Sequence, residues 1–292
     1  MFWGLGAKAN YHVTQQIGAG VLKKISQIAI GADDSIYALE KSGKVTLFSP
    51  SGDLIRSFNV GFNNTEAITI SPDGEVYILS TLTKKKKVKV GARMRTVQIP
   101  TGVQCIVFDA QGKKIKSFEL KNLKSAKTAR IIKGTLVVAD LTAKSIVFMD
   151  LETGKETGRI KKGLRLCCGI FDFCEGPNQT LAVANLGAFK VQHFDMTGKL
   201  LLEFGKRGRA MDDFQGCCNP VSVGYLSDER IVTVEKDPTR IKIYDAAGKN
   251  AVKIDGVEEL VEGCSFIPIA IDSQNNIYLG ANAKNYIVKC EP

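Results

Sequence analysis

Ile241-Lys-Ile-Tyr-Asp-Ala-Ala-Gly248 reads as an alternating strand that ends in an aromatic residue and turns at an aspartate and a glycine. The same pattern occurs five more times along the chain. Its other copies are Val45-Thr-Leu-Phe-Ser-Pro-Ser-Gly52, Cys105-Ile-Val-Phe-Asp-Ala-Gln-Gly112, Ile146-Val-Phe-Met-Asp-Leu-Glu-Thr-Gly154, Val191-Gln-His-Phe-Asp-Met-Thr-Gly198 and the shortened Tyr286-Ile-Val-Lys-Cys290. A unit that recurs in this way predicts a repeat architecture.

Each copy is preceded by another apolar strand, and the spacing of these strands predicts the fold. They begin near Ile36, Val76, Leu136, Leu181, Ile231 and Ile277, at intervals of 40, 60, 45, 50 and 46 residues. The long interval contains an insertion over residues 82–101. Repeats of this length, with short strands and Gly, Asp and Asn turns, are typical of propeller blades. We therefore expect one all-β domain over residues 1–292, a six-bladed β-propeller of four-stranded antiparallel blades.

The expected blades cover approximately residues 25–60, 64–121, 125–162, 166–205, 217–255 and 264–290. The last repeat lacks a fourth strand, whereas residues 11–17, Tyr-His-Val-Thr-Gln-Gln-Ile, read as a strand that belongs to no blade. We predict that this N-terminal strand completes the last blade and closes the ring, because closure protects strand edges that would otherwise be exposed.

Three segments resemble NHL repeats, namely Leu136–Phe148, Leu181–Val191 and Ile231–Tyr244, and residues 204–214 resemble the linker between NHL blades. The resemblance covers most of residues 25–290 and is strongest from about 166 to 250. It implies a six-bladed propeller. It implies little about activity, because NHL propellers include enzymes, RNA binders and protein-binding platforms, so the function has to be inferred from a site.

Five cysteines occupy one position of three successive repeats. They are the doublets Cys167-Cys168 and Cys217-Cys218 and the single Cys264. Cys167, Cys217 and Cys264 lie 14, 14 and 13 residues, respectively, before the second strand of their own repeats. Equivalent positions of neighbouring blades lie side by side, so we expect these thiols to meet at one mouth of the central channel. Cys174 is a reserve candidate, and Asp172 is a carboxylate that we expect to face the channel beside them.

Three interpretations of the cysteines remain open. Thiolates that converge from a rigid frame suit an iron–sulfur cluster or another thiolate-bound metal, used for electron transfer or redox sensing. For a metal, the predicted ligands are Cys167, Cys168, Cys217, Cys218 and Cys264, although no CxxC spacing is present. Disulfides, either between blades or within a doublet, are the second interpretation. In the third, the thiols are structural and buried, and no cofactor is bound; for Cys105 and Cys290 we favour this one.

Two other functional classes remain open beside a metal centre. A non-enzymatic scaffold with structural cysteines or disulfides would bind a protein or polyanion partner. An NHL-type enzyme with a site at the channel mouth is the remaining class. The chain has two histidines, His12 and His193, neither of which is predicted at the channel mouth. It also lacks the GxSxG, P-loop and dinucleotide-binding motifs. The sequence therefore disfavours an enzyme without deciding the question.

The formal net charge is +10, and the insertion at residues 82–101 carries the densest run of basic residues. This run begins with Lys84, Lys85, Lys86 and Lys87. Alternating valines predict a β-hairpin that projects from blade two. Such a surface would attract a polyanion or an acidic redox protein. No aromatic residue lies among the lysines, so stacking on nucleic-acid bases is not indicated.

The sequence leaves the compartment open. No apolar run is long enough for a transmembrane helix, and the first six residues are too short for a signal-peptide core. Eight cysteines suit the cytoplasm if the thiols are free or metal-bound. They suit the periplasm or an extracellular location if they form disulfides and a leader has been removed. We expect a monomer.

Overall fold

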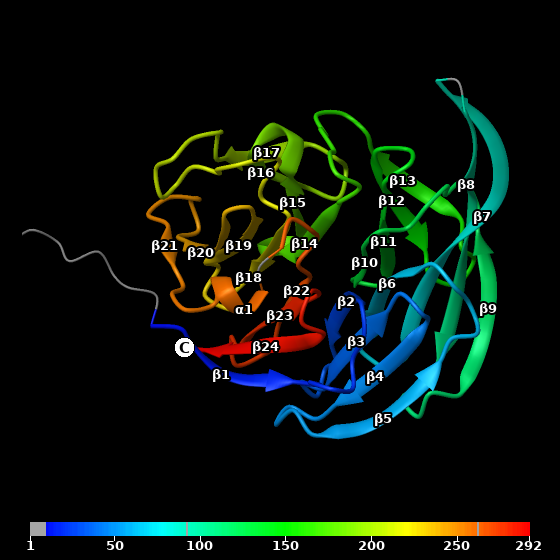
Figure 1. The fold of residues 1–292 in the computed structure, drawn as a ribbon, viewed down its shortest axis with the longest axis horizontal. Coiled ribbons are helices and arrows are strands. Elements are labelled where there is room, and N and C mark those ends of the chain that lie inside the picture. Colours follow the sequence, from blue (N-terminus) through cyan, green and yellow to red (C-terminus); the bar gives the residue numbers. More distant parts are fainter. Residues whose placement is uncertain (1–9, 92, 262) are drawn as a thin grey trace, which may run out of the picture.

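The structure is a computed structural model that describes residues 10–91, 93–261 and 263–292. The expectation about a leader in the first six residues lies outside these ranges. The described residues form six four-stranded antiparallel sheets arranged in a ring (Figure 1). The predicted all-β, six-bladed propeller is therefore confirmed. Within the described ranges, no helix has the length and apolar character needed to cross a membrane.

Each blade is built from consecutive strands, ordered outward from the centre of the ring. Blade one has β2 (Ile25–Ile30), β3 (Ile36–Glu40), β4 (Lys44–Phe48) and β5 (Leu54–Asn59). Blade two has β6 (Thr65–Ile70), β7 (Val76–Val90), β8 (Arg93–Phe108) and β9 (Lys114–Leu120). Blade three has β10 (Ala129–Ile132), β11 (Thr135–Asp140), β12 (Ser145–Asp150) and β13 (Glu156–Ile160).

The other three blades repeat this order, and the last one uses both ends of the chain. Blade four has β14 (Asp172–Gly176), β15 (Thr180–Asn185), β16 (Lys190–Phe194) and β17 (Leu200–Phe204), with 3-10 turns at Pro177–Gln179 and Leu186–Ala188. Blade five has β18 (Ser222–Tyr225), β19 (Ile231–Lys236), β20 (Thr239–Tyr244) and β21 (Val252–Lys253), followed by the short helix α1 (Glu258–Val261). Blade six has β22 (Ile269–Ile271), β23 (Ile277–Ala281), β24 (Tyr286–Glu291) and β1 (His12–Ile17).

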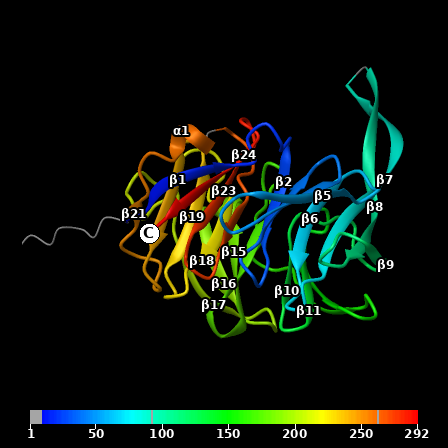
Figure 2. The ribbon, with the colours of Figure 1, turned by 90° about the horizontal axis from the view of Figure 1, so that it is seen from below.

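The ring closes where β1 pairs antiparallel with β24, as predicted. The pairing runs from His12 opposite Glu291 to Ile17 opposite Ile287. Figure 2 shows β1 and β24 side by side. The outer strand of blade six thus comes from the opposite end of the chain, and no gap remains between the first and last blades.

The hydrophobic core consists of six clusters, each formed mainly by two neighbouring blades. The cluster between blades six and one contains Ile17, Leu22, Phe48 and Tyr278, all almost inaccessible to solvent. Burial of apolar surface stabilises a fold by roughly 25 cal/mol per Å². Each blade therefore depends on both of its neighbours for its stability.

The innermost strands of all six blades surround a central channel, which a layer of polar side chains divides. Gln27 Nε2 donates to Thr128 Oγ1 at 3.4 Å, and Thr128 Oγ1 donates to Asp172 Oδ1 at 3.0 Å. All three residues are buried, and we call them the polar belt. A cavity of about 90 Å³ lies on the side where the innermost strands begin. A cavity of about 330 Å³ lies on the side where they end.

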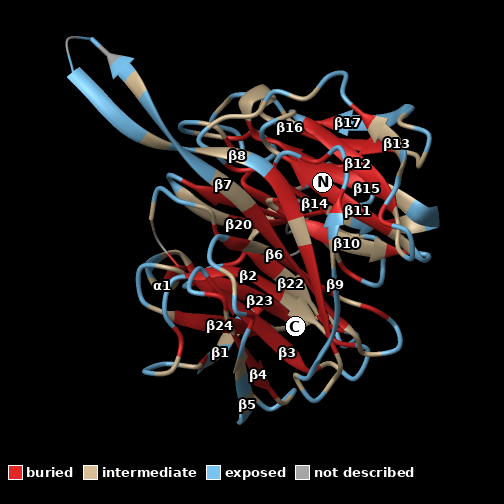
Figure 3. Cartoon of the chain, turned by 90° about the vertical axis from the view of Figure 1, so that its right-hand side faces the viewer, coloured by how far each residue is buried: buried red, intermediate tan, exposed pale blue. Residues whose placement is uncertain are grey.

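Strands β7 and β8 extend beyond their blade as a two-stranded ribbon (Figure 3). Their pairing continues to Val90 opposite Arg93. Residues 83–100, which we call the basic arm, contain seven lysines and arginines and no acidic residue. The four lysines Lys84 to Lys87 are exposed. The ribbon places most of the net positive charge of the chain away from the ring.

Shortening Ile17 tests how much the ring depends on the closing strand. We expect Ile17→Ala to lower the free energy of unfolding by about 2–4 kcal/mol, because the side chain is buried between blades six and one. Urea unfolding followed by circular dichroism measures the change. Gln16→Ala, on the exposed side of β1, is the control and should change stability by less than about 0.5 kcal/mol. Equal effects of the two substitutions would contradict this account.

Candidate thiolate centre

Three of the predicted thiols meet at the mouth of the channel where the innermost strands begin. The sulfur atoms of Cys167, Cys168 and Cys218 all lie within 4.8 Å of one another. Cys167 Sγ is 2.6 Å from Cys218 Sγ and 3.4 Å from Cys168 Sγ. We call these residues the thiol trio. It joins two neighbouring blades, since Cys167 and Cys168 precede β14 whereas Cys218 precedes β18.

An unusual backbone conformation brings both sulfurs of a doublet to one side. Cys168 has φ +55° and Cys218 has φ +58°, so the second cysteine of each doublet is left-handed. Consecutive residues of a regular strand point to opposite faces, whereas this turn holds the two sulfurs of each doublet 3.4 and 3.6 Å apart. The left-handed conformation costs a residue with a side chain of the order of 1–3 kcal/mol, and such residues concentrate at functional sites.

The two cysteine loops are anchored by polar side chains at equivalent positions of the repeat. In blade four, Asn185 at the end of β15 accepts a hydrogen bond from the backbone of Arg165 at 2.7 Å. In blade five, Glu235 near the end of β19 accepts one from the backbone of Gln215 at 2.8 Å. Asp140 does the same for Lys124 in blade three, at 2.9 Å. The scaffold thus fixes each loop from its own second strand.

Glu235 is itself held by two cations. Arg240 lies 2.8 Å and Lys242 lies 3.0 Å from its carboxylate oxygens, and both Glu235 and Lys242 are fully buried. Burial lowers the pKa of Lys242 to about 8 although Glu235 opposes this shift. Removing one partner of such a buried network is costly, because the remaining charge is left uncompensated. The side chain that anchors the blade-five loop is therefore held firmly in place.

A buried lysine of blade five affects the pKa of Cys168. Lys236 is 2% exposed. Burial alone would lower its pKa, but Cys168, Cys264 and Cys217 together raise it above its usual value. In return, a hydrogen bond with Lys236 and then one with Cys167 lower the pKa of Cys168. Burial and the neighbouring thiols raise the pKa of Cys218. Lys236 therefore favours the thiolate form of Cys168.

The remaining predicted residues lie at different distances from the trio. Cys217 lies next to it, with its sulfur 3.6 Å from that of Cys218. Cys264 is exposed and lies close enough to Lys236 to affect its pKa. Cys174 lines the larger cavity, beyond the polar belt. Asp172 is part of the belt, where burial raises its pKa to about 6. Cys174 and Asp172 are therefore separated from the other candidates.

The two cysteines that we expected to be structural, Cys105 and Cys290, are fully buried in the blades. Burial raises the pKa of each thiol to about 12. They are therefore neutral apolar groups at physiological pH, as the sequence indicated. The four lysines at the start of the basic arm lie on β7, on the part of the ribbon that leaves the ring (Figure 3). The base of the arm is near the blade-four cysteine loop, since Thr83 and Pro100 line one cavity together with Gly169.

Lys236 was not among the predicted site residues, although the comparison of the repeats contains a signal for it. The residue that follows the loop anchor is Leu141 in blade three and Leu186 in blade four, whereas blade five has Lys236. A lysine at a position that is apolar in neighbouring repeats indicates a specific partner. The larger cavity could not be predicted either, since it is lined by side chains from blades distant in sequence.

Replacing Lys236 by methionine tests its effect on Cys168. We expect Lys236→Met to raise the pKa of Cys168, so that less thiolate is present at pH 7. The reaction of Cys168 with iodoacetamide should then slow by about threefold to tenfold, since one pKa unit changes the thiolate fraction up to tenfold. Peptide mass spectrometry over pH 6–9 measures the rate, and Lys133→Met is the control. An unchanged pH profile would show that Lys236 does not stabilise the thiolate.

Comparisons with known proteins support the fold and leave the activity open. No protein-family model matches the chain, and no curated protein matches its sequence. Virginiamycin B lyase from Staphylococcus aureus is a similar solved structure, with TM-score 0.63 and 12% identity over 97% of this chain and all of that one. A streptogramin B lyase structure is similar with TM-score 0.62 and 12% identity, over 96% of this chain and 97% of that one. At this identity the likeness shows a shared β-propeller fold.

Proposed function

We propose that the protein binds one soft metal ion through Cys167, Cys168 and Cys218 and uses this centre for electron transfer or redox sensing. The observation that carries the proposal is the convergence of three sulfur atoms, from two neighbouring blades, within 4.8 Å of one another. A closed propeller is a rigid frame, and thiolates held by a rigid frame are the usual ligands of soft metals.

The sulfur spacing favours a single ion over a cluster. Tetrahedral zinc has metal–sulfur bonds of about 2.3 Å, which places its sulfurs about 3.8 Å apart. The separations within the two doublets, 3.4 and 3.6 Å, are near this value. Cys167 and Cys218, at 2.6 Å, would have to separate by about 1 Å to share an ion. An iron–sulfur cluster whose cysteines bind different irons needs a wider arrangement.

The charges around the site also support a thiolate-bound ion. Three thiolates leave a net charge of −1 around a divalent ion and −2 around Cu(I). Lys236 is buried beside these sulfurs and offsets that charge. Cys217 is placed to supply a fourth sulfur, since it lies next to Cys218. Iron or copper in this site would support electron transfer, whereas zinc would leave a structural centre with oxidisable thiols.

Metal analysis of the purified protein tests the proposal. We expect about one soft metal ion per chain after anaerobic purification, and loss of that ion in the Cys167→Ser, Cys218→Ser double variant. Cys105→Ala is the matched control, because its thiol is buried away from the mouth, and it should keep the ion. Elemental analysis and thiol titration give both readouts. The proposal would be wrong if the reduced wild-type protein contained no metal, or if the double variant kept it. A disulfide between Cys167 and Cys218 would instead favour a non-enzymatic interaction scaffold.

A second candidate function, polyanion binding, is favoured by one observation. The basic arm projects from the ring and carries seven cations without an acidic residue (Figure 3). The cations of the projecting arm can contact a partner without contact between that partner and the ring. The expected partner is a polyanion, recognised by its charge density rather than by stacking.

Neutralising the lysines of the arm tests this second candidate. Changing Lys84, Lys85, Lys86 and Lys87 to glutamine should weaken binding to single-stranded RNA or to anionic lipid vesicles at least tenfold at low salt. It should also reduce the steepness of the plot of log affinity against log salt concentration, with a change of about three in its slope. Fluorescence anisotropy and vesicle sedimentation measure the two partners. Binding that is absent in the wild type, or unaffected by the substitutions, would contradict the proposal.

A further inference from the structure

The larger cavity is a concave pocket inside the ring, on the side of the polar belt opposite the thiols. Its volume of about 330 Å³ falls at the lower end of the range for small-molecule sites. Most of its wall is aliphatic and comes from the innermost strands of different blades. The wall includes Ile28, Ile68, Ile70, Ile131, Ile269 and Ile271. Such a wall fits a branched aliphatic group.

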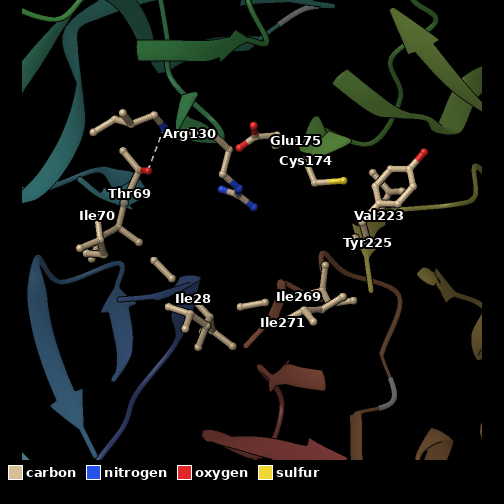
Figure 4. A pocket seen from close by; sticks show the side chains of 16 residues that line it. Ile28, Thr69, Ile70, Arg130, Cys174, Glu175, Val223, Tyr225, Ile269 and Ile271 are labelled. Atoms are coloured by element: carbon tan, nitrogen blue, oxygen red, sulfur yellow. Dashed lines mark hydrogen bonds between the residues drawn. The ribbon is translucent and has the colours of Figure 1, made fainter. Parts of the chain in front are cut away.

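Two charged side chains, Arg130 and Glu175, line this cavity. Figure 4 shows the Arg130 guanidinium pointing into the cavity, with Glu175 on the same wall. Arg130 comes from blade three and Glu175 from blade four. A cation and an anion beside an aliphatic wall define one polar end of the pocket.

Only some of the hydrogen-bond donors of the Arg130 guanidinium have a partner in the protein. Its Nη1 donates to the backbone oxygen of Ala129 at 2.8 Å, and its Nη2 lies 3.9 Å from Asp172 Oδ1. A guanidinium has five N–H donors. Most of them are therefore left for a ligand or for water, and a planar carboxylate is the group that matches their geometry best.

Glu175 is complementary to Arg130. Among the described residues its carboxylate forms no ion pair and no side-chain hydrogen bond. It is exposed because it faces the open cavity, yet the surrounding walls desolvate it enough to raise its pKa. Lys133 is near enough to oppose this shift but forms no ion pair with Glu175, so an ammonium group would find a carboxylate without an ion-pair partner here. A ligand with only a carboxylate would be repelled by Glu175, and one with only an ammonium group would be repelled by Arg130.

The part of the wall next to Glu175 carries no charge at neutral pH. Tyr225 lines the cavity with its hydroxyl 2.9 Å from His193 Nδ1. Burial lowers the pKa of His193 to about 4 and raises that of Tyr225. Cys174 beside it is a neutral thiol, since burial raises its pKa too. The charged end of the pocket is thus confined to Arg130 and Glu175.

We infer that this cavity binds a small zwitterion with an aliphatic body, such as a branched-chain α-amino acid. Arg130 binds the carboxylate, Glu175 binds the ammonium group, and the isoleucines surround the side chain. The site is independent of the thiolate centre, because the polar belt lies between them.

Calorimetric titration with L-leucine and two analogues tests the inference. 4-Methylpentanoate lacks the ammonium group and 3-methylbutylamine lacks the carboxylate. We expect L-leucine to bind, and each analogue to bind at least tenfold more weakly, since each leaves one charge of the pocket unpaired. The Cys167→Ser, Cys218→Ser variant should bind L-leucine as the wild type does, which separates this test from that of the metal centre.

Two substitutions assign the roles of the charged residues. Glu175→Gln should reduce the affinity for L-leucine to about that for 4-methylpentanoate, and Arg130→Gln to about that for 3-methylbutylamine. Glu175 has no ion-pair partner in the described structure, so its variant should fold even if loss of Arg130 disturbs Asp172. Arg95→Gln, in the basic arm, is the control. No binding of L-leucine by the wild type, or equal binding of the analogues, would overturn the inference.

Discussion

The antiparallel pairing of β1 with β24 is the constraint on which the other features depend. Each blade buries its faces against two neighbours, so a ring with one open joint would expose two blade faces to water. Closure at this joint uses residues from the two ends of the chain and fixes the six innermost strands around one axis. The position of every loop and cavity along the channel follows from that arrangement.

The thiolate centre shows how a repeat fold can bring reactive groups together. Two loops, 50 residues apart in sequence, are held by Asn185 and Glu235 at the same position of their blades. Each loop carries a cysteine doublet whose second residue is left-handed. The blades supply the geometry, whereas Lys236 supplies the electrostatics by favouring a thiolate on Cys168. In blade five both contributions come from one strand, since the loop anchor Glu235 and the cation Lys236 are consecutive residues of β19.

Sequence reasoning predicted the features that depend on register. The repeat spacing predicted six blades and the closing strand, and the equal offsets of the cysteines predicted that thiols from neighbouring blades meet. It could not predict features that depend on local backbone conformation or on contacts across the channel. The left-handed turns at Cys168 and Cys218, the separation of Cys174 from the trio, and the presence of Arg130 and Glu175 in one cavity are of this kind. The resemblance to NHL repeats correctly implied a propeller, whereas no family model matches the chain and membership of the NHL family stays a prediction.

The hydrogen-bonded layer of Gln27, Thr128 and Asp172 gives the molecule two chemically different ends. The layer lies between two cavities that share no lining residue, so a small molecule in one cavity contacts a different set of side chains from a molecule in the other. The exposed sulfur of Cys168 lies at one end, whereas Cys174 lies at the other beside Arg130. A single axis therefore offers two separate environments, one rich in sulfur and one aliphatic with two opposite charges.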